Sequence, residues 1–210
     1  MLTAVKFPTT RQELLEAGGS GLVRFPANLE EYWELLKTAE YRADFYQNEI
    51  IAMSYETDLH SHIMFEFLFL LKNIFPNRVK HRVHNSNRPI YVRYRGEPGV
   101  FNPDGSVVSQ PPVYFEYQPG MNAETTPIVL FEVLSPSTRH YDFGTKLPCY
   151  KSIPTLQYII YLEIDRPSAL VYERKSENSW TETEYTKAED VLWIANNPIA
   201  LKDIYLNVHF

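Results

Sequence analysis

The sequence predicts an α/β domain, and three observations support this class. Two segments have the length and apolar spacing of helices, one after Pro26 and one between Thr57 and Pro76. Shorter apolar stretches typical of strands alternate with turn-rich segments, and they lie near residues 79–84, 90–94, 105–109 and 128–134. The 210 residues, 44% of them hydrophobic, are enough to build one sizeable core.

The N-terminal part is expected to be an irregular extension. Residues 1–25 hold one short helical candidate, TRQELLEA, which ends in GGSG, a composition typical of a flexible link. Residues 26–210 are expected to form the single domain. Its first helix has Asn28 as a candidate cap, and residues 41–56 then alternate like a hairpin with the turn near residues 47–48.

The middle and the end of the chain continue this alternation. A long apolar helix is expected to begin at Thr57 or Asp58 and to stop at Pro76. Residues 110–127 are rich in Pro and polar residues, and we expect a long loop there that holds a partner or substrate. The remaining expected elements are a short helix near 142–152, a strand within 155–165, a hairpin from 168–175 and 180–186, and an apolar segment from Val191.

Three short motifs carry the strongest chemical signal. They are FNPDGSV with Asp104, VLFEVLSPST with Glu132 and YDFGTKLPCY with Lys146. Glu132 lies inside an apolar run where burial would otherwise exclude a charge, and a buried carboxylate needs a compensating partner. The compensators that the sequence offers are a hard divalent cation and the Lys146 ammonium.

This pattern predicts metal-assisted cleavage of a phosphodiester. Mg²⁺ held by one or two carboxylates keeps several waters, lowers the pKa of one of them and neutralises charge that builds on the phosphorus oxygens. The expected ligands are Asp104, Glu132 and the backbone carbonyl of Val133. Lys146 is expected to orient the attacking water or to stabilise the transition state.

The charge distribution points to one candidate nucleic-acid surface. A formal net charge of −6 argues mildly against binding nucleic acid through bulk charge. One strongly basic segment, residues 78–95, contains no acid, and a pair of solvated strands explains it about as well as a phosphate-contacting face. The residues that would contact DNA phosphates there are Arg78, Lys80, Arg82, Arg88, Arg93 and Arg95.

The composition and the missing motifs indicate the cellular compartment and exclude other classes of reaction. Cys149 is the only cysteine, so no intramolecular disulfide can form, and no N-terminal stretch resembles a signal peptide. No window approaches the roughly 18 apolar residues of a membrane span. We therefore expect a cytoplasmic protein with no membrane contact. Gly-rich phosphate loops, G-x-S-x-G and H-E-x-x-H motifs are absent.

Four motifs together carry a family resemblance. MSYETDLHSHI, NPDGSVV, FEVLSPSTRHYDFGTK and SIPTLQYII resemble the Uma-two family of bacterial endonucleases, which belongs to the PD-(D/E)xK nuclease superfamily. The similarity spans nearly the whole chain, from Pro26 to Val208. The resemblance implies a restriction-endonuclease-like domain, with a mixed central β-sheet flanked by helices. It also implies a Mg²⁺ or Mn²⁺ site and DNA as the substrate.

The functional residues of that family can be placed on this chain one at a time. The first acid of the motif matches Asp104 and the second matches Glu132, while Leu134 replaces the lysine expected two residues later. The resemblance implies that Lys146, on the next helix, supplies the missing charge. The auxiliary residues that it implies are Asp44 in the first hairpin, His60, and Asp142 and Tyr150 one turn before and after the lysine.

The sequence departs from the family pattern at the lysine-bearing helix. Pro148 can clash there with the carbonyl of Gly144 unless the helix begins near Thr145. Lys146 could therefore point in a different direction. Elsewhere, Tyr158 replaces a frequent acid and Asn48 a turn glycine, but neither position is an expected metal ligand.

Alternative functions stay open at this point. Asp104, between a proline and a glycine, could serve only to shape a turn. A nuclease fold without turnover could act as a DNA-binding or regulatory protein, which the displaced lysine favours. A structural homo-oligomer could bury Glu132 and Lys146 as a dry pair. For an active nuclease we expect a homodimer, because two sites cut both strands of a duplex most easily.

Overall fold

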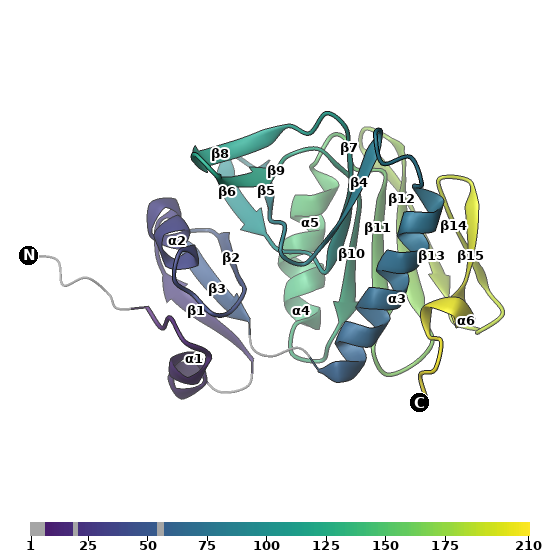
Figure 1. Ribbon diagram of the computed structural model, residues 1–210, viewed down its shortest axis with the longest axis horizontal. Coiled ribbons are helices and arrows are strands. Elements are labelled where there is room, and N and C mark those ends of the chain that lie inside the picture. The colour runs from purple at the N-terminus through teal and green to yellow at the C-terminus, as the bar shows by residue number, and fades with distance from the viewer. Residues whose placement is uncertain (1–6, 19–20, 54–56) are drawn as a thin grey trace, which may run out of the picture.

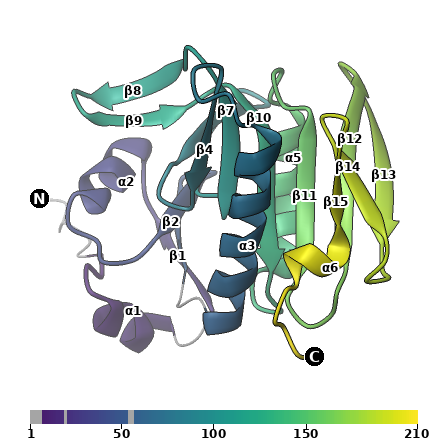
Figure 2. The ribbon, with the colours of Figure 1, turned by 45° about the vertical axis from the view of Figure 1, so that its right-hand side comes forward.

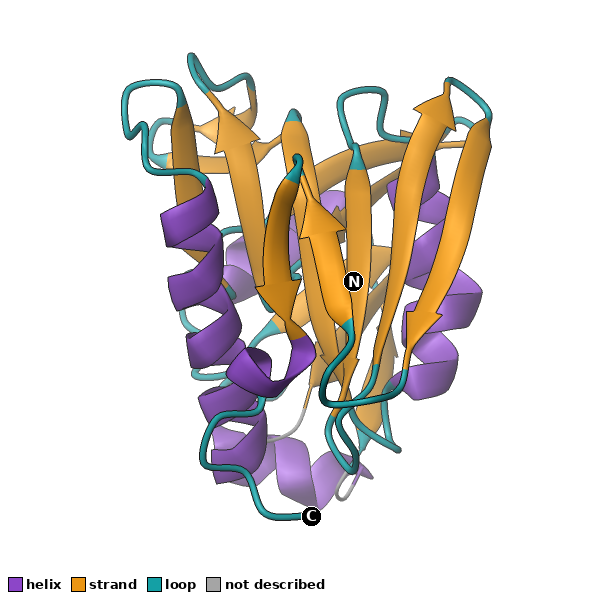
Figure 3. Cartoon of the chain, turned by 90° about the vertical axis from the view of Figure 1, so that its right-hand side faces the viewer, coloured by secondary structure: helices purple, strands orange, loops and turns teal. Residues whose placement is uncertain are grey.

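The structure, a computed structural model, describes residues 7–18, 21–53 and 57–210. Its described strands form two large sheets and one two-stranded ribbon (Figure 1). Both parallel and antiparallel pairs occur in each large sheet, and helices lie on both sides of the strands (Figure 3). The predicted class, an α/β fold with mixed sheets flanked by helices, is confirmed.

The first sheet contains most of the N-terminal half of the chain. In spatial order its strands are β1 (Leu22–Pro26), β3 (Glu49–Met53), β2 (Ala43–Tyr46), β6 (Glu97–Phe101), β5 (Ile90–Tyr94), β9 (Met121–Glu124) and β8 (Tyr114–Gln118). Helices α1 (Arg11–Gly18) and α2 (Leu29–Leu36) pack on it through a core that contains Tyr32, Trp33 and Phe45. The predicted cap is confirmed, because the Asn28 side chain accepts a hydrogen bond from the N–H of Glu31 in a capping box.

The second sheet carries the predicted motifs. In spatial order its strands are β13 (Ser179–Tyr185), β12 (Ala169–Ser176), β11 (Tyr158–Glu163), β10 (Pro127–Leu134), β7 (Gly105–Ser109) and β4 (His81–Asn85). One face is covered by α3 (Asp58–Ile74), α6 (Leu201–Ile204) and the ribbon of β14 (Val191–Ile194) and β15 (Asn197–Ala200). Against the other face pack α4 (Arg139–Tyr141), the π-helical turn η1 (Asp142–Lys146) and α5 (Leu147–Lys151).

Strand β10 is buried on both faces, which explains its continuous apolar sequence. Successive side chains of a strand point to opposite faces. Val129, Phe131 and Val133 therefore pack in the core under α3, whereas Leu130 and Leu134 pack in the core with α5. Glu132 shares the second face, so its carboxylate points toward the helical segment that carries Lys146.

Some expected boundaries were wrong. Residues 22–25, expected to be irregular, lie in β1, which pairs with β3 in register Leu22 to Met53. The long loop expected at 110–127 instead forms the β8–β9 hairpin, which stacks Phe115 on Tyr91 with ring centroids 4.0 Å apart. Strand β6 begins inside the expected separator at 95–99. The glycine-rich link falls partly on residues 19–20, which lie outside the described residues.

The long helix and the first hairpin match expectation. Thr57 caps α3 by accepting from the N–H of His60, and the helix ends before Pro76. The turn at Gln47 and Asn48 has positive φ at both residues, as a type I′ hairpin turn requires. No helix in the described part of the chain has the length and apolar character needed to cross a bilayer.

Gly105 offers a test of how tightly β7 packs beside the site. A Cβ at this position would lie 2.2 Å from Cε1 of Phe131, whose fully buried ring packs edge-on against Phe67 and has no room to move. We expect Gly105→Ala to lower the free energy of unfolding by about 1–3 kcal/mol in urea denaturation followed by circular dichroism. Gly21→Ala is the matched control, because a Cβ there meets nothing within 4 Å. Equal midpoints for the two variants would show that the packing argument is wrong.

Candidate active site

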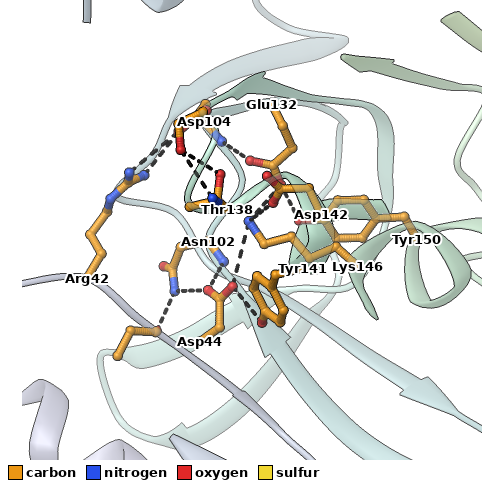
Figure 4. A network of polar contacts seen from close by, with 12 residues as sticks. Arg42, Asp44, Asn102, Asp104, Glu132, Thr138, Tyr141, Asp142, Lys146 and Tyr150 are labelled. Atoms are coloured by element: carbon orange, nitrogen blue, oxygen red, sulfur yellow. Dashed lines mark hydrogen bonds and ion pairs between the residues drawn. The ribbon is translucent and has the colours of Figure 1, made fainter. Parts of the chain in front are cut away.

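A cleft of about 280 Å³ lies where β10, the loop before β7 and the first turn of α3 come together. Most of the predicted site residues converge on it (Figure 4). The polar side chains that line it include Arg42, His60, Asp104, Glu132, Asp142 and Lys146. Asp44 and Tyr150 lie behind this lining and contact it through hydrogen bonds. Residues separated by more than 100 positions in the sequence therefore form one polar cluster.

Asp104 is a buried carboxylate held by cations and by the backbone. Its Oδ2 accepts a 2.7 Å hydrogen bond from the N–H of Val133 and lies 3.1 Å from Nε2 of His60. Its Oδ1 lies 3.4 Å from the guanidinium of Arg42. Burial alone would raise the pKa of Asp104, but His60 and Arg42 hold that pKa well below its usual range. Asp104 is therefore ionised throughout the neutral pH range.

Glu132 lies beside Asp104 and is held from the opposite side. Its Oε1 accepts from the Lys146 ammonium at 3.0 Å and from the Tyr150 hydroxyl at 2.7 Å. Its Oε2 accepts a 3.3 Å hydrogen bond from the backbone N–H of Asp104, so the loop that carries the first acid rests on the second. Burial raises the pKa of Glu132 to about 8, and the Lys146 ammonium opposes that rise.

Lys146 connects three buried acids. Its Nζ lies 3.0 Å from Glu132, 3.2 Å from Asp142 and 3.7 Å from Asp44. Burial would lower the pKa of Lys146, but the three carboxylates raise it well above the usual value. The side chain therefore remains an ammonium. It can donate hydrogen bonds and stabilise negative charge, but it cannot act as a general base.

A π-helical turn orients that lysine. Between Asp142 and Lys146 the backbone adopts a wide turn, in which the N–H of Leu147 bonds to the carbonyl of Asp142, five residues earlier. Pro148 then occupies the first turn of α5, where its missing N–H costs no hydrogen bond. The clash that the sequence predicted is avoided in this way. The expected pairing of Asp142 with Lys146 is formed.

Asp44 supports the site from the first sheet. It is fully buried on β2, and its Oδ1 accepts from the backbone N–H and the side-chain amide of Asn102. Its Oδ2 accepts from the Tyr141 hydroxyl. Burial raises the pKa of Asp44, and these donors together with Lys146 oppose the rise. Because Asn102 precedes Asp104 by two residues, Asp44 fixes the loop that presents the first acid.

The structure does not gather the six basic residues on one surface. Arg78, Lys80 and Arg82 lie in β4 or just before it, on the second sheet. Arg88 is used internally, since it pairs with Glu124 at 3.0 Å. Arg93 and Arg95 belong to the β5–β6 hairpin of the first sheet. None of the six is among the described residues that line the cleft.

Sequence reasoning missed several residues of the site. Arg42 lies just before β2 in a stretch with no local signal, yet it contacts Asp104 across 62 positions of the sequence. Asn102 belongs to the same NPD motif as Asp104. Its amide, two residues before a predicted functional acid, is a signal that could have identified it as a site residue. Ser135 and Thr138 also line the cleft, with their hydroxyl oxygens 3.0 Å apart.

The donor atoms of the cleft fit a hard divalent cation. Asp104 and Glu132 supply carboxylate oxygens. Strand β7 pairs with β10 only as far as Phe131, so Val133 has no pairing partner on β7. In the described ranges, no group of three or more His, Cys, Asp or Glu side chains is arranged to hold a metal. A cation here would have two carboxylates, a carbonyl and several waters, which suits Mg²⁺ or Mn²⁺.

The buried ion cluster gives a stability prediction. Lys146→Met leaves Glu132 and Asp142 buried without their ammonium, so we expect a loss of about 3–5 kcal/mol in the free energy of unfolding. Adding Glu132→Gln removes one of the two carboxyl groups that lost their partner and should recover part of this loss in a double-mutant cycle. Lys187→Met, at an exposed position, serves as the control. Strictly additive effects of the two substitutions would contradict the proposed coupling.

Comparisons with known proteins found a similar sequence and a similar fold. One relative is sll1609, an uncharacterized protein of Synechocystis sp. (strain ATCC 27184 / PCC 6803 / Kazusa). It is 28% identical over 156 residues, which cover 73% of this chain and 84% of that protein. A similar fold occurs in the crystal structure of "a putative nuclease belonging to DUF820 from Anabaena variabilis ATCC 29413". Its TM-score is 0.62 at 16% identity, with 94% of this chain and 98% of that chain covered.

The family comparison covers most of the domain. A family model described as "Putative restriction endonuclease" matches residues 29–201, a span that includes every carboxylate of the cleft and Lys146. The resemblance noted in the sequence is confirmed by this match. The chain therefore belongs to the Uma2 family of restriction-endonuclease-like proteins.

Proposed function

We propose that the protein is a metal-dependent endonuclease that hydrolyses phosphodiester bonds of DNA. One observation carries this proposal: Asp104 and Glu132 line one cleft, where the Glu132 carboxylate accepts from the backbone N–H of Asp104 and from the ammonium of Lys146. Two hard oxygen ligands beside a fixed cation are what phosphodiester hydrolysis needs. Membership of a family described as "Putative restriction endonuclease", and a fold shared with "a putative nuclease", support the same reaction class.

The proposed metal ligands are Asp104, Glu132 and the backbone carbonyl of Val133. A bound Mg²⁺ or Mn²⁺ would lower the pKa of a coordinated water and neutralise charge on the scissile phosphate. Asp104 is ionised at neutral pH and is therefore ready to bind a cation. Asp44 acts as a positioning residue, because it holds the loop that presents Asp104.

Lys146 supplies positive charge on the other side of Glu132. As a permanent ammonium, it orients the attacking water by donating to it and stabilises negative charge in the transition state. Asp142 and Tyr150 fix its direction and that of Glu132, respectively. Arg42 and His60 contact Asp104 at the cleft and provide cationic and hydrogen-bonding groups for phosphate oxygens.

DNA is the proposed substrate and a homodimer the proposed assembly. Phosphate contacts from the basic residues before and within β4 would position the DNA without reading its sequence. Two copies would bring two clefts to the two strands. The remaining basic residues at the β5–β6 hairpin belong to a different sheet and would contact DNA only at another point along its length.

A second candidate is a DNA-binding protein of the same fold without turnover. The observation that favours it is the pairing of both acids with protein cations: Asp104 with Arg42 and His60, and Glu132 with Lys146. In that protein the cluster would serve only stability. The lining of an open cleft by both acids and Lys146 favours the catalytic proposal over a dry structural pair.

Plasmid nicking tests the reaction. With Mg²⁺ or Mn²⁺ the wild-type chain should convert supercoiled plasmid to nicked or linear forms, and EDTA should stop it. Asp104→Asn and Glu132→Gln should each reduce the rate by about 100-fold or more, because each removes a metal ligand. Asp165→Asn, at an exposed acid, is the matched control and should cleave at the wild-type rate. Wild-type cleavage by either ligand variant would refute the assigned roles.

Calorimetry tests the metal site separately from turnover. Titration of Mn²⁺ into the wild-type protein should release or absorb heat with a stoichiometry near one ion per chain. The double variant Asp104→Asn/Glu132→Gln should show no saturable heat, since both carboxylates are lost. Asp165→Asn again provides the control. An unchanged isotherm in the double variant would show that the metal binds elsewhere. The cleft would then be only a cluster of salt bridges.

A further inference from the structure

We propose that a groove between α3 and β4 is a second nucleic-acid site, which binds an unpaired strand next to the cleft. The proposal rests on the proposed function, because the strand held in the groove is taken to be part of the same DNA substrate. The proposed substrate is DNA with a single-stranded segment, a class that the cleft alone does not define.

The groove consists of two adjoining cavities along one side of α3. The first has a volume of about 310 Å³ and the second about 710 Å³. They share Phe69, Lys72, Val83 and His84, so they form one continuous channel. Figure 2 shows α3 running beside β4 along this side of the molecule.

Two exposed aromatic rings stand at the groove. Phe65 and Phe69 keep 69% and 56% of their surface exposed, although they belong to the most apolar helix of the chain. At a spacing of four residues they lie on one face of α3, one turn apart. Exposed aromatic rings in a row are suited to stacking on unpaired bases, and such stacking is independent of sequence because every base has a π-face.

The charge of the groove matches a phosphate backbone. Its lining carries Lys72, Arg78 and Arg82 together with two histidines, and none of the described residues that line either cavity is acidic. This is a local exception in a chain whose net charge is −6. Basic side chains interleaved with aromatic rings are the combination that proteins use to bind single strands.

The groove lies next to the candidate active site along α3 and β4. His60 contacts Asp104 from the first turn of α3, and Met64 and Leu68 follow on the same face and line the first cavity. On the strand side, Asn85 lines this cavity and pairs with Gly105, the residue after Asp104. From His60 to Lys72 the helix rises about 18 Å. A strand in the groove would therefore lead to the cleft.

The same charges argue against a second copy of the chain as the occupant. A two-fold contact would bring each copy's cations, Arg78 and Arg82 among them, against the same surface of the other copy, which is unfavourable for like charges. The free edge of β4 also carries the exposed Arg82, and a charge on an edge strand discourages pairing with another strand. The groove therefore suits a polyanion better than a copy of itself.

Binding of a fluorescein-labelled 20-nucleotide single strand, followed by polarisation in EDTA, tests the proposal without cleavage. Phe65→Ala/Phe69→Ala and Lys72→Glu/Arg82→Glu should each weaken binding by about tenfold or more, and the second should also reduce the salt dependence. Val191→Ala/Trp193→Ala and Lys187→Glu/Lys202→Glu are matched controls at exposed hydrophobic or basic positions outside the groove. The controls should bind as the wild type does. Thermal melting by circular dichroism confirms that each variant is folded.

The outcomes separate this inference from the proposed function. Groove variants that bind like the wild type would overturn the inference, whatever the result of plasmid nicking. Loss of binding confined to the groove variants would support it even if no metal promotes cleavage, and then the proposed reaction alone would fail. A dimer that Phe65→Ala/Phe69→Ala converts to a monomer, with unchanged binding of the oligonucleotide, would assign the groove to a second copy and overturn the inference.

Discussion

The structure around the cleft depends on the burial of one ammonium group among three carboxylates. Lys146 contacts Glu132 from the second sheet, Asp44 from the first sheet and Asp142 from its own helical turn. All four side chains are almost completely buried, and no carboxylate of this group could remain charged in the core without a cation. Because the partners come from both sheets, the cluster also fixes the first sheet relative to the second.

The same cluster determines where the acids of the cleft point. Asp44 bonds to Asn102 and so positions the loop of Asp104, while Tyr150 and Lys146 hold Glu132 from the side of α5. The backbone N–H of Val133 holds the Asp104 carboxylate, and Lys146 and Tyr150 hold that of Glu132. A site that is preorganised in this way loses little entropy when it binds a cation. A metal that binds there must partly displace the protein cations that already contact the acids.

Local signals predicted most of the helices and the first hairpin. Asn28 and Thr57 are capping residues whose side chains bond the helix starts, and residues 47–48 tolerate the positive φ of their turn. The β8–β9 hairpin was missed because its strands are held by distant partners: Phe115 stacks on Tyr91, and Tyr117 stacks on Trp33 of α2. Strand β1 was missed because it exists only by pairing with β3.

A site residue could be predicted from the sequence where its side chain is unusual for the segment that carries it. Glu132 stands out in an apolar strand, and Asp104 and Lys146 follow from the family motif. Arg42 has no such signal, since its role depends on the approach of two sheets, and the π turn that orients Lys146 cannot be seen in the periodicity of the sequence. The basic segment was a weaker guide, because residues adjacent in sequence were divided between two sheets.

The most direct test is a crystal of the protein soaked in Mn²⁺, with an anomalous difference map collected at the manganese edge. We expect one peak in the cleft, at about 2.0–2.6 Å from oxygens of both Asp104 and Glu132, the range for hard cations. A peak elsewhere would contradict it. So would a map with no peak in which Asp104 remains paired with Arg42 and Glu132 with Lys146.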